Sequence, residues 1–230
     1  MSLKPTKIAP SVLAYDLGNL RGAVEIANKG GADLIHLDVI DGHFAPNITF
    51  GAGTIRALRR ASRLKFEAHL MIDNPRPYVH DYAEAGADTL VFQAEVLDPA
   101  SFDALFAVVR SYDKHVGVAL KPETDLPKWV EDRLGRLATI LILTVNPGFS
   151  GQKMDVNQFG KIERIGKIVR ERGYETDVEI DGGIDAQNIH EVAKRGGNSF
   201  VAGAGVYGQP DPVQAISLLR AKADAARSGP

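Results

Sequence analysis

The chain has 230 residues, of which 44% are apolar and 24% are charged. This composition supports one buried core and excludes a disordered or fibrous protein. The absence of cysteine excludes disulfides, thiolate metal sites and cysteine nucleophiles. A formal charge of −2 with mixed signs provides no basic stripe for nucleic acid, so we expect a small-molecule partner.

Neither a membrane span nor a secretory signal is expected from the sequence. No run approaches the ~18 consecutive apolar residues that a membrane span needs. The segment Met1–Pro10 lacks the long apolar stretch of a secretory signal. We therefore expect a cytoplasmic protein that does not bind membranes.

Short apolar, β-branched runs alternate with segments whose apolar residues recur at helical spacing. In chain order the predicted elements are strand Ile8–Ser11, helix Leu17–Lys29, strand Leu34–Val39, helix Thr54–Ala61, strand Lys65–Leu70, helix Tyr78–Ala85, strand Thr89–Gln93, helix Phe102–Ser111, strand Val116–Leu120, a helical segment near Trp129, strand Thr139–Val145, helix Asn157–Arg172, strand Asp177–Asp181, helix Asn188–Arg195, strand Ser199–Ala202 and helix Pro212–Ala226. Strands that alternate with helices predict βαβ units and a parallel sheet.

The number and length of these units predict an α/β fold of the (β/α)8 barrel type, with residues 1–230 as a single domain. Eight units leave roughly 29 residues each, close to the minimum for a βαβ unit and to the size of such barrels. A doubly wound open sheet is the alternative. That fold commonly carries a glycine-rich turn after its first strand, whereas Ser11–Ala14 contains no glycine.

Polar side chains stand at the ends of three predicted strands. His36 and Asp38 are two residues apart and project to the same face of the second strand, His69 ends the third strand, and Asp181 ends the seventh. A single His or Asp at a strand end is more often a hydrogen-bonded structural group than a ligand. Four at one barrel mouth favour a divalent ion of the Zn, Mn, Fe or Co type, because buried unpaired carboxylates are costly.

Glycine-rich loops follow the last three predicted strands, at Asn146–Gln152, Asp181–Ile184 and Ala202–Gly205. Glycines let backbone N–H groups approach an anion, and the loops after strands seven and eight are the recurrent phosphate site of these barrels. Glycine also serves tight turns without any ligand. Three consecutive loops of this kind favour phosphate, held by backbone dipoles and a helix N-terminus.

With these motifs in place, the chain resembles the ribulose-phosphate 3-epimerase family over nearly its whole length. The motifs that carry the resemblance are Ile8–Ser11, His36–Phe44 with Pro46–Asn47, His69–Met71, Val145–Phe149 with Gly151–Gln152, and Glu179–Gly183. The resemblance implies a (β/α)8 barrel and one divalent metal ion per subunit, often zinc. The implied ligands are His36, Asp38, His69 and Asp181, and the two aspartates are the implied acid/base pair.

The resemblance also implies which residues meet the substrate and its phosphate. They are Ser11, His36, His69, Met71, Gly148, Phe149, Ser150, Gly151, Gly182, Gly183, Gly203 and Ala204, and the loop from Gly148 to Gln152 is expected to close over the substrate. The chain departs from the family at five positions. Ile40 and Leu143 stand where methionine is usual, Gln93 replaces a histidine, Ser150 a glycine and Ala204 a serine.

The expected activity is a metal-dependent 3-epimerisation that interconverts D-ribulose 5-phosphate and D-xylulose 5-phosphate by two-base proton transfer through an enediolate. The expected ion is zinc, with Fe, Mn or Co as alternatives. The departures leave a hexulose or tetrulose phosphate open as substrate, and a non-catalytic sugar-phosphate-binding protein is a further alternative. Related enzymes assemble in several ways, so a homo-oligomer is among the expected states.

Overall fold

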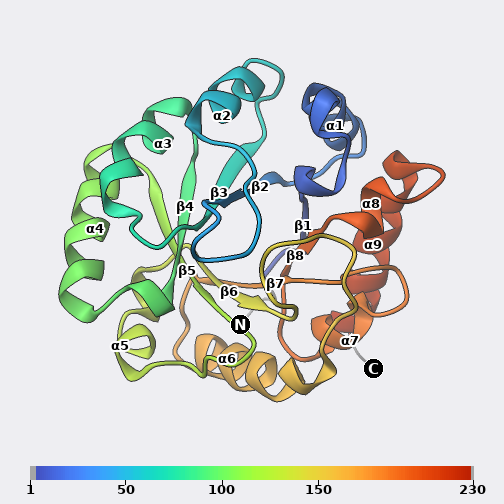
Figure 1. Ribbon diagram of the computed structural model, residues 1–230. Coiled ribbons are helices and arrows are strands. Elements are labelled where there is room, and N and C mark those ends of the chain that lie inside the picture. The colour runs from blue at the N-terminus through green and yellow to red at the C-terminus, as the bar shows by residue number, and fades with distance from the viewer. Residues whose placement is uncertain (1–3, 229–230) are drawn as a thin grey trace.

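Eight parallel strands follow one another around a barrel in the computed structural model, which describes residues 4–228 (Figure 1). The strands are β1 (Lys7–Pro10), β2 (Leu34–Ile40), β3 (Lys65–Met71), β4 (Thr89–Gln93), β5 (His115–Leu120), β6 (Thr139–Leu143), β7 (Asp177–Asp181) and β8 (Ser199–Ala202). Their hydrogen-bonded order runs from β1 through β8 and back down to β2. A parallel bridge between Ser11 and His36 brings the first and last strands of that order together, so the predicted (β/α)8 barrel is confirmed.

Helices surround the strands as an outer ring (Figure 1). They are α1 (Leu20–Lys29), α2 (Ala52–Arg59), α3 (Val79–Ala85), α4 (Pro99–Ser111), α5 (Lys128–Glu131), α6 (Phe159–Glu171), α7 (Ile189–Lys194), α8 (Ala204–Tyr207) and α9 (Pro212–Arg227). Capping side chains set several of their starts. Asp98 and Ser101 form a capping box at α4, and Asp211 accepts a hydrogen bond from the Gln214 N–H at α9.

Several predicted boundaries differ from the structure by a few residues, and one helix was not predicted. The helix predicted from Leu17 begins at Leu20, because the Asn19 side chain accepts from the Gly22 N–H and caps the helix there. The strand predicted to reach Val145 ends at Leu143. Helix α8 was not predicted, since its four residues are too few to show a helical period.

Alternation along the strands separates two faces of the barrel wall. Inside β4, Leu90 and Phe92 pack in the large core between strands and helices, whereas Val91 belongs to a small apolar cluster with Ala119 and Leu141. Adjacent strand residues point to opposite faces. The same rule turns His36 and Asp38 away from the helices, because Ile35, Leu37 and Val39 between and beside them pack in the large core.

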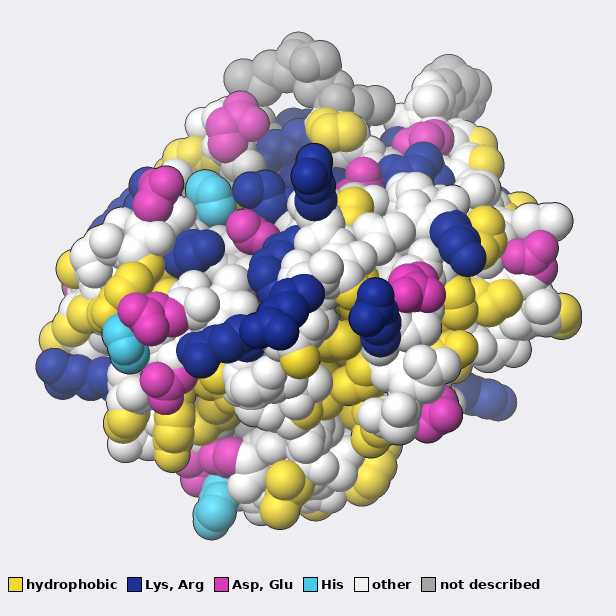
Figure 2. Space-filling model, turned by 90° about the horizontal axis from the view of Figure 1, so that it is seen from above, with side chains coloured by type: hydrophobic (Ala, Val, Ile, Leu, Met, Phe, Trp, Pro, Cys, Tyr) yellow, Lys and Arg dark blue, Asp and Glu magenta, His cyan; other side chains and the backbone are white. Residues whose placement is uncertain are grey.

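The outer surface carries mixed charge. Figure 2 shows Lys and Arg side chains interspersed with Asp, Glu and apolar side chains on the face that it presents, as the formal charge of −2 suggests. Among residues 4–228, no helix combines the length and the apolar character needed to cross a membrane.

Candidate active site

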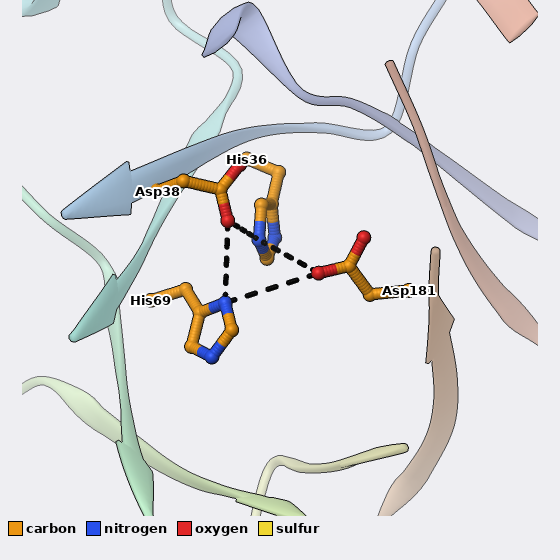
Figure 3. A group of neighbouring side chains, drawn as sticks. All are labelled: His36, Asp38, His69 and Asp181. Carbon is orange, nitrogen blue, oxygen red and sulfur yellow. Dashed lines mark hydrogen bonds and ion pairs between the residues drawn. The ribbon is translucent and has the colours of Figure 1, made fainter. Parts of the chain in front are cut away.

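Three strands bring the four predicted ligands together at one end of the barrel. His36 and Asp38 come from β2, His69 from β3 and Asp181 from the last position of β7. Asp38 is paired in register with His69 on the neighbouring strand. One ligand atom from each of the four side chains lies within 4.8 Å of the others. The four side chains point toward one another (Figure 3).

The contacts within this cluster centre on one oxygen of each carboxylate. Asp38 Oδ1 lies 3.1 Å from His36 Nε2 and 3.3 Å from His69 Nδ1. Asp181 Oδ2 lies 3.9 Å from each of the same two nitrogens. Both histidines are fully buried, Asp38 is 5% exposed and the Asp181 side chain is 18% exposed, so the cluster is largely shielded from solvent.

The surroundings of the two aspartates shift their pKa values in opposite directions. Burial acts to raise the pKa of Asp38, but the charge of His36 and hydrogen bonds from both imidazoles outweigh it and hold that pKa well below its usual range. Burial and the nearby Asp38 charge raise the pKa of Asp181 to about 6. Near neutral pH one carboxyl is therefore fully ionised, while the other retains a protonated fraction.

A second buried layer, which the sequence analysis missed, lies beneath the cluster. His36 Nδ1 lies 3.1 Å from Glu67 Oε1, and Glu67 is paired in register with His36. Glu179 accepts hydrogen bonds from Ser199 Oγ at 2.8 Å and Thr139 Oγ1 at 3.1 Å. Burial and the neighbouring Glu67 raise the pKa of Glu179 well above its usual range. The inward alternation of β3 and β7 could have identified both glutamates from the sequence.

The cluster opens into a cavity of about 630 Å³ at the carboxyl ends of the strands. Asp38 and Asp181 line it. The other predicted substrate-contacting residues that line the same cavity are Ser11, Met71, Gly148, Phe149, Ser150, Gly151, Gly182, Gly183, Gly203 and Ala204. His36 and His69 lie beneath it, outside its lining. The structure thus gathers the predicted residues around one space.

Ser11 contacts the cluster directly. Its Oγ donates to Asp38 Oδ2 at 2.5 Å, and both side chains are buried. A short hydrogen bond to an ionised carboxylate is among the stronger ones in proteins. Ser11 therefore fixes the orientation of Asp38 and leaves Asp38 Oδ1 directed at the two histidines.

The glycine loops form the far side of the cavity. Gly183 has a φ of +64°, and a Cβ there would lie 2.5 Å from the Met154 backbone nitrogen. The Thr144 hydroxyl donates to the Gly182 carbonyl at 2.6 Å. These contacts hold the loop after β7 against the loop after β6, so backbone groups rather than side chains line this side.

The loop after β6 bends toward the loop after β2. Asn47 Nδ2 donates to the Gly148 carbonyl at 2.7 Å, and Gln152 Nε2 donates to the Asn146 and Phe149 carbonyls at 2.8 and 2.9 Å. The Phe149 side chain is 58% exposed at the rim of the cavity. The loop is therefore attached at both ends while its tip faces the solvent.

The departures from the family pattern fall in two places. Ile40, Leu143, Ser150 and Ala204 line the cavity. Gln93 lies below it, fully buried, with its amide nitrogen 2.7 Å from His69 Nε2. The first four residues can act on the shape of the substrate space, whereas Gln93 acts on a predicted metal ligand.

The donor set fits a divalent transition metal ion. Two imidazole nitrogens with two carboxylate oxygens suit Zn, Mn, Fe or Co, whereas Mg and Ca favour sites made of oxygen alone. The four donors are inward-facing and no lysine or arginine is paired with Asp38 or Asp181 among residues 4–228. A cation would therefore balance the two carboxylates at this point.

The fold and the cluster together define a (β/α)8-barrel enzyme with a His and Asp centre beneath an open cavity. The chain belongs to the ribulose-phosphate 3 epimerase family, whose sequence model matches residues 7–207. It is therefore an isomerase of the epimerase type.

Named relatives align in sequence with almost the whole chain. A ribulose-phosphate 3-epimerase of Mycobacterium tuberculosis is 40% identical over 219 residues, which cover 95% of this chain and 93% of the relative. The cytoplasmic isoform of the enzyme in Oryza sativa is 35% identical over 216 residues, covering 93% and 92%.

Solved structures of other proteins share the barrel fold of this chain. The structure of KGPDC from Streptococcus mutans in complex with D-R5P has a TM-score of 0.71 to this chain with 14% sequence identity, and covers 96% of this chain and 98% of its own. At that identity the likeness concerns the fold alone.

Proposed function

We propose that the protein interconverts D-ribulose 5-phosphate and D-xylulose 5-phosphate by moving the proton at C3 from one face of the substrate to the other. One observation carries the proposal. Asp38 from β2 and Asp181 from β7 both line one cavity and belong to a cluster that also holds two imidazoles. Two carboxyl groups on either side of a carbon are what inversion requires, because one face must lose a proton and the other must gain one.

The two aspartates divide this work. In one direction the ionised carboxylate of Asp38 accepts the C3 proton, and Asp181 in its protonated form donates a proton to the opposite face of the enediolate. In the other direction the roles exchange. The pKa values, which the surroundings drive apart in opposite directions, suit a pair that begins with one proton between them. Ser11 fixes the orientation of the Asp38 carboxylate through its 2.5 Å hydrogen bond to Oδ2.

His36, Asp38, His69 and Asp181 would hold one divalent ion per subunit, and zinc is the ion that we propose, with Fe, Mn and Co as alternatives. When bound, the ion supplies a Lewis acid that stabilises negative charge on the substrate oxygens next to C3. The buried imidazoles keep their donor nitrogens directed at this point, and the apolar strand residues around them limit access of water.

The phosphate of the substrate is proposed to bind at the glycine loops after β6, β7 and β8. Gly182, Gly183 and Gly203 line the cavity together with the loop from Gly148 to Gly151. Binding the distant phosphate orients C3 between the aspartates, and that binding energy promotes the reaction at the other end of the molecule.

A different ketose phosphate is the second candidate, because Ser150 and Ala204 line the cavity where the family carries other residues. Measuring turnover of a panel of pentulose, hexulose and tetrulose phosphates separates the two. The proposal expects ribulose 5-phosphate to have the highest kcat/KM, and the unphosphorylated pentulose to react poorly. A hexulose or tetrulose phosphate as the best substrate would replace the proposed one.

The acid/base assignment is tested by replacing each carboxylate with an amide of the same size. Asp38→Asn and Asp181→Asn are each expected to lower kcat by about 10²–10⁴-fold, the usual contribution of a positioned acid or base. His115→Gln, at the exposed first residue of β5, is the control and keeps full activity. Near-normal turnover in either aspartate variant would contradict the assignment.

We also propose the cytoplasm as the place of the reaction.

A further inference from the structure

Each of the two buried imidazoles has one nitrogen in the cluster and the other against a buried polar side chain. His36 directs Nε2 at the aspartates and Nδ1 at Glu67 Oε1, 3.1 Å away. His69 does the reverse. Its Nδ1 faces the aspartates, and its Nε2 lies 2.7 Å from the amide of Gln93. The two rings therefore offer different nitrogens to the same point.

A neutral imidazole carries its proton on one nitrogen and a lone pair on the other. A metal ion takes the lone pair, so the nitrogen outside the cluster must carry the proton. His36 must then be protonated at Nδ1 and His69 at Nε2. Each of these N–H groups needs a buried acceptor, because a buried donor without a partner destabilises the folded protein.

Glu67 supplies the acceptor for His36. It is 5% exposed, faces inward from β3 and is the register partner of His36 on β2. A carboxylate accepts hydrogen bonds and does not donate them. With an ion in the cluster, the 3.1 Å contact between Oε1 and Nδ1 lets Glu67 accept the Nδ1–H of His36, so that the lone pair of Nε2 is available to the ion.

Gln93 can supply the acceptor for His69. Its Oε1 is the one buried side-chain polar atom without a hydrogen-bond partner among the described residues. The oxygen and nitrogen of an amide exchange places when the group turns by 180°. With Oε1 turned toward His69, the amide accepts from Nε2–H, and the lone pair of Nδ1 is free. In the opposite orientation the amide donates to Nε2 and leaves the proton on Nδ1, facing Asp38.

We propose that Glu67 and Gln93 are positioning residues that hold the two histidines in opposite tautomers, Nδ1–H in His36 and Nε2–H in His69, so that both present lone pairs to one divalent ion. The inference rests on the proposed function for the presence of that ion. It adds a residue from β4 and a further one from β3 to the determinants of metal binding, neither of which touches the substrate cavity.

The test measures zinc affinity by competition with a chelator, using variants that keep or remove the acceptor. Glu67→Gln and Gln93→Glu retain an oxygen that can accept, and should bind zinc nearly as tightly as the unaltered protein. Glu67→Leu and Gln93→Met remove it at similar size, and should bind zinc about 10–100-fold more weakly, as expected for partners of metal-binding histidines. Far-ultraviolet circular dichroism checks that each variant is folded.

A second readout is the nitrogen-15 spectrum of the imidazoles in the zinc-loaded protein, which distinguishes a protonated ring nitrogen from one with a lone pair. We expect His36 protonated at Nδ1 and His69 at Nε2. The reverse tautomer in either ring overturns the inference, as does unchanged zinc affinity in both acceptor-free variants. If those variants bind zinc normally while the protein epimerises its substrate, this inference alone fails. If the unaltered protein binds no zinc and no other divalent ion, the proposed metal centre fails with it.

Discussion

Removing the metal ion is expected to lower the thermal stability of the protein strongly. The four donors are side chains of β2, β3 and β7, strands that are scattered when the chain unfolds, so the ion binds the folded state in preference. At a free ion concentration of about 1,000 times Kd, binding adds about 4.1 kcal/mol. For a chain of this length, each kcal/mol shifts Tm by about 2–4 °C, so the expected rise is about 8–16 °C.

Differential scanning calorimetry of the protein with excess chelator, and again after zinc is restored, measures this rise. Asp181→Asn removes one anionic ligand, and each tenfold loss of affinity removes about 1.4 kcal/mol of the stabilisation. The response of that variant should be correspondingly smaller. His115→Gln, which changes a histidine far from the cluster at the start of β5, should keep the full response. A Tm that does not respond to the ion, or responds equally in Asp181→Asn, would refute the metal site.

Three further predictions concern residues around the site and in the core. Burial raises the pKa of Tyr82 to about 12. Since an unfolded tyrosine ionises near pH 10, the free energy of unfolding should fall as the pH rises from about 10 to 12. Tyr82→Phe should lessen this fall, measured by urea unfolding, by up to about 1.4 kcal/mol per pH unit. Gly183→Ala places a Cβ 2.5 Å from a backbone nitrogen at a φ of +64° and should cost about 1–3 kcal/mol with a raised KM; Gly53→Ala, on α2 with open space, should not destabilise. Thr144→Val removes the donor to the Gly182 carbonyl and should cost about 1–3 kcal/mol. Unfolding curves that are unchanged in Tyr82→Phe at high pH, in Gly183→Ala or in Thr144→Val would contradict the corresponding prediction.

The barrel could be predicted because its signal repeats. Eight apolar runs at regular spacing indicate one repeated unit, and the inward direction of His36 and Asp38 follows from the two-residue period of a strand. The sequence could not show that β2, β3 and β7 converge, since closure depends on pairing between residues far apart, such as the bridge from Ser11 to His36.

The supporting layer was missed for a different reason. Glu67 and Glu179 stand at inward positions of β3 and β7. A charged residue next to an apolar run can also mark the exposed end of a strand, so a single glutamate does not by itself indicate a buried site. Gln93 was noticed only as a departure from the family pattern. Its contact with His69 depends on the register of β3 against β4, in which His69 is paired with Val91, and register cannot be read from either segment alone.

The most direct test of the central claim follows deuterium at C3 during a single conversion of ribulose 5-phosphate in deuterated water. Two carboxyl groups on opposite faces predict that the first xylulose 5-phosphate formed already carries deuterium at C3, because the donated proton comes from a second acid in exchange with solvent. The same measurement on Asp38→Asn and Asp181→Asn should show almost no epimer. An initial product that retains the original hydrogen, or deuterated product formed at a normal rate by either variant, would contradict the account.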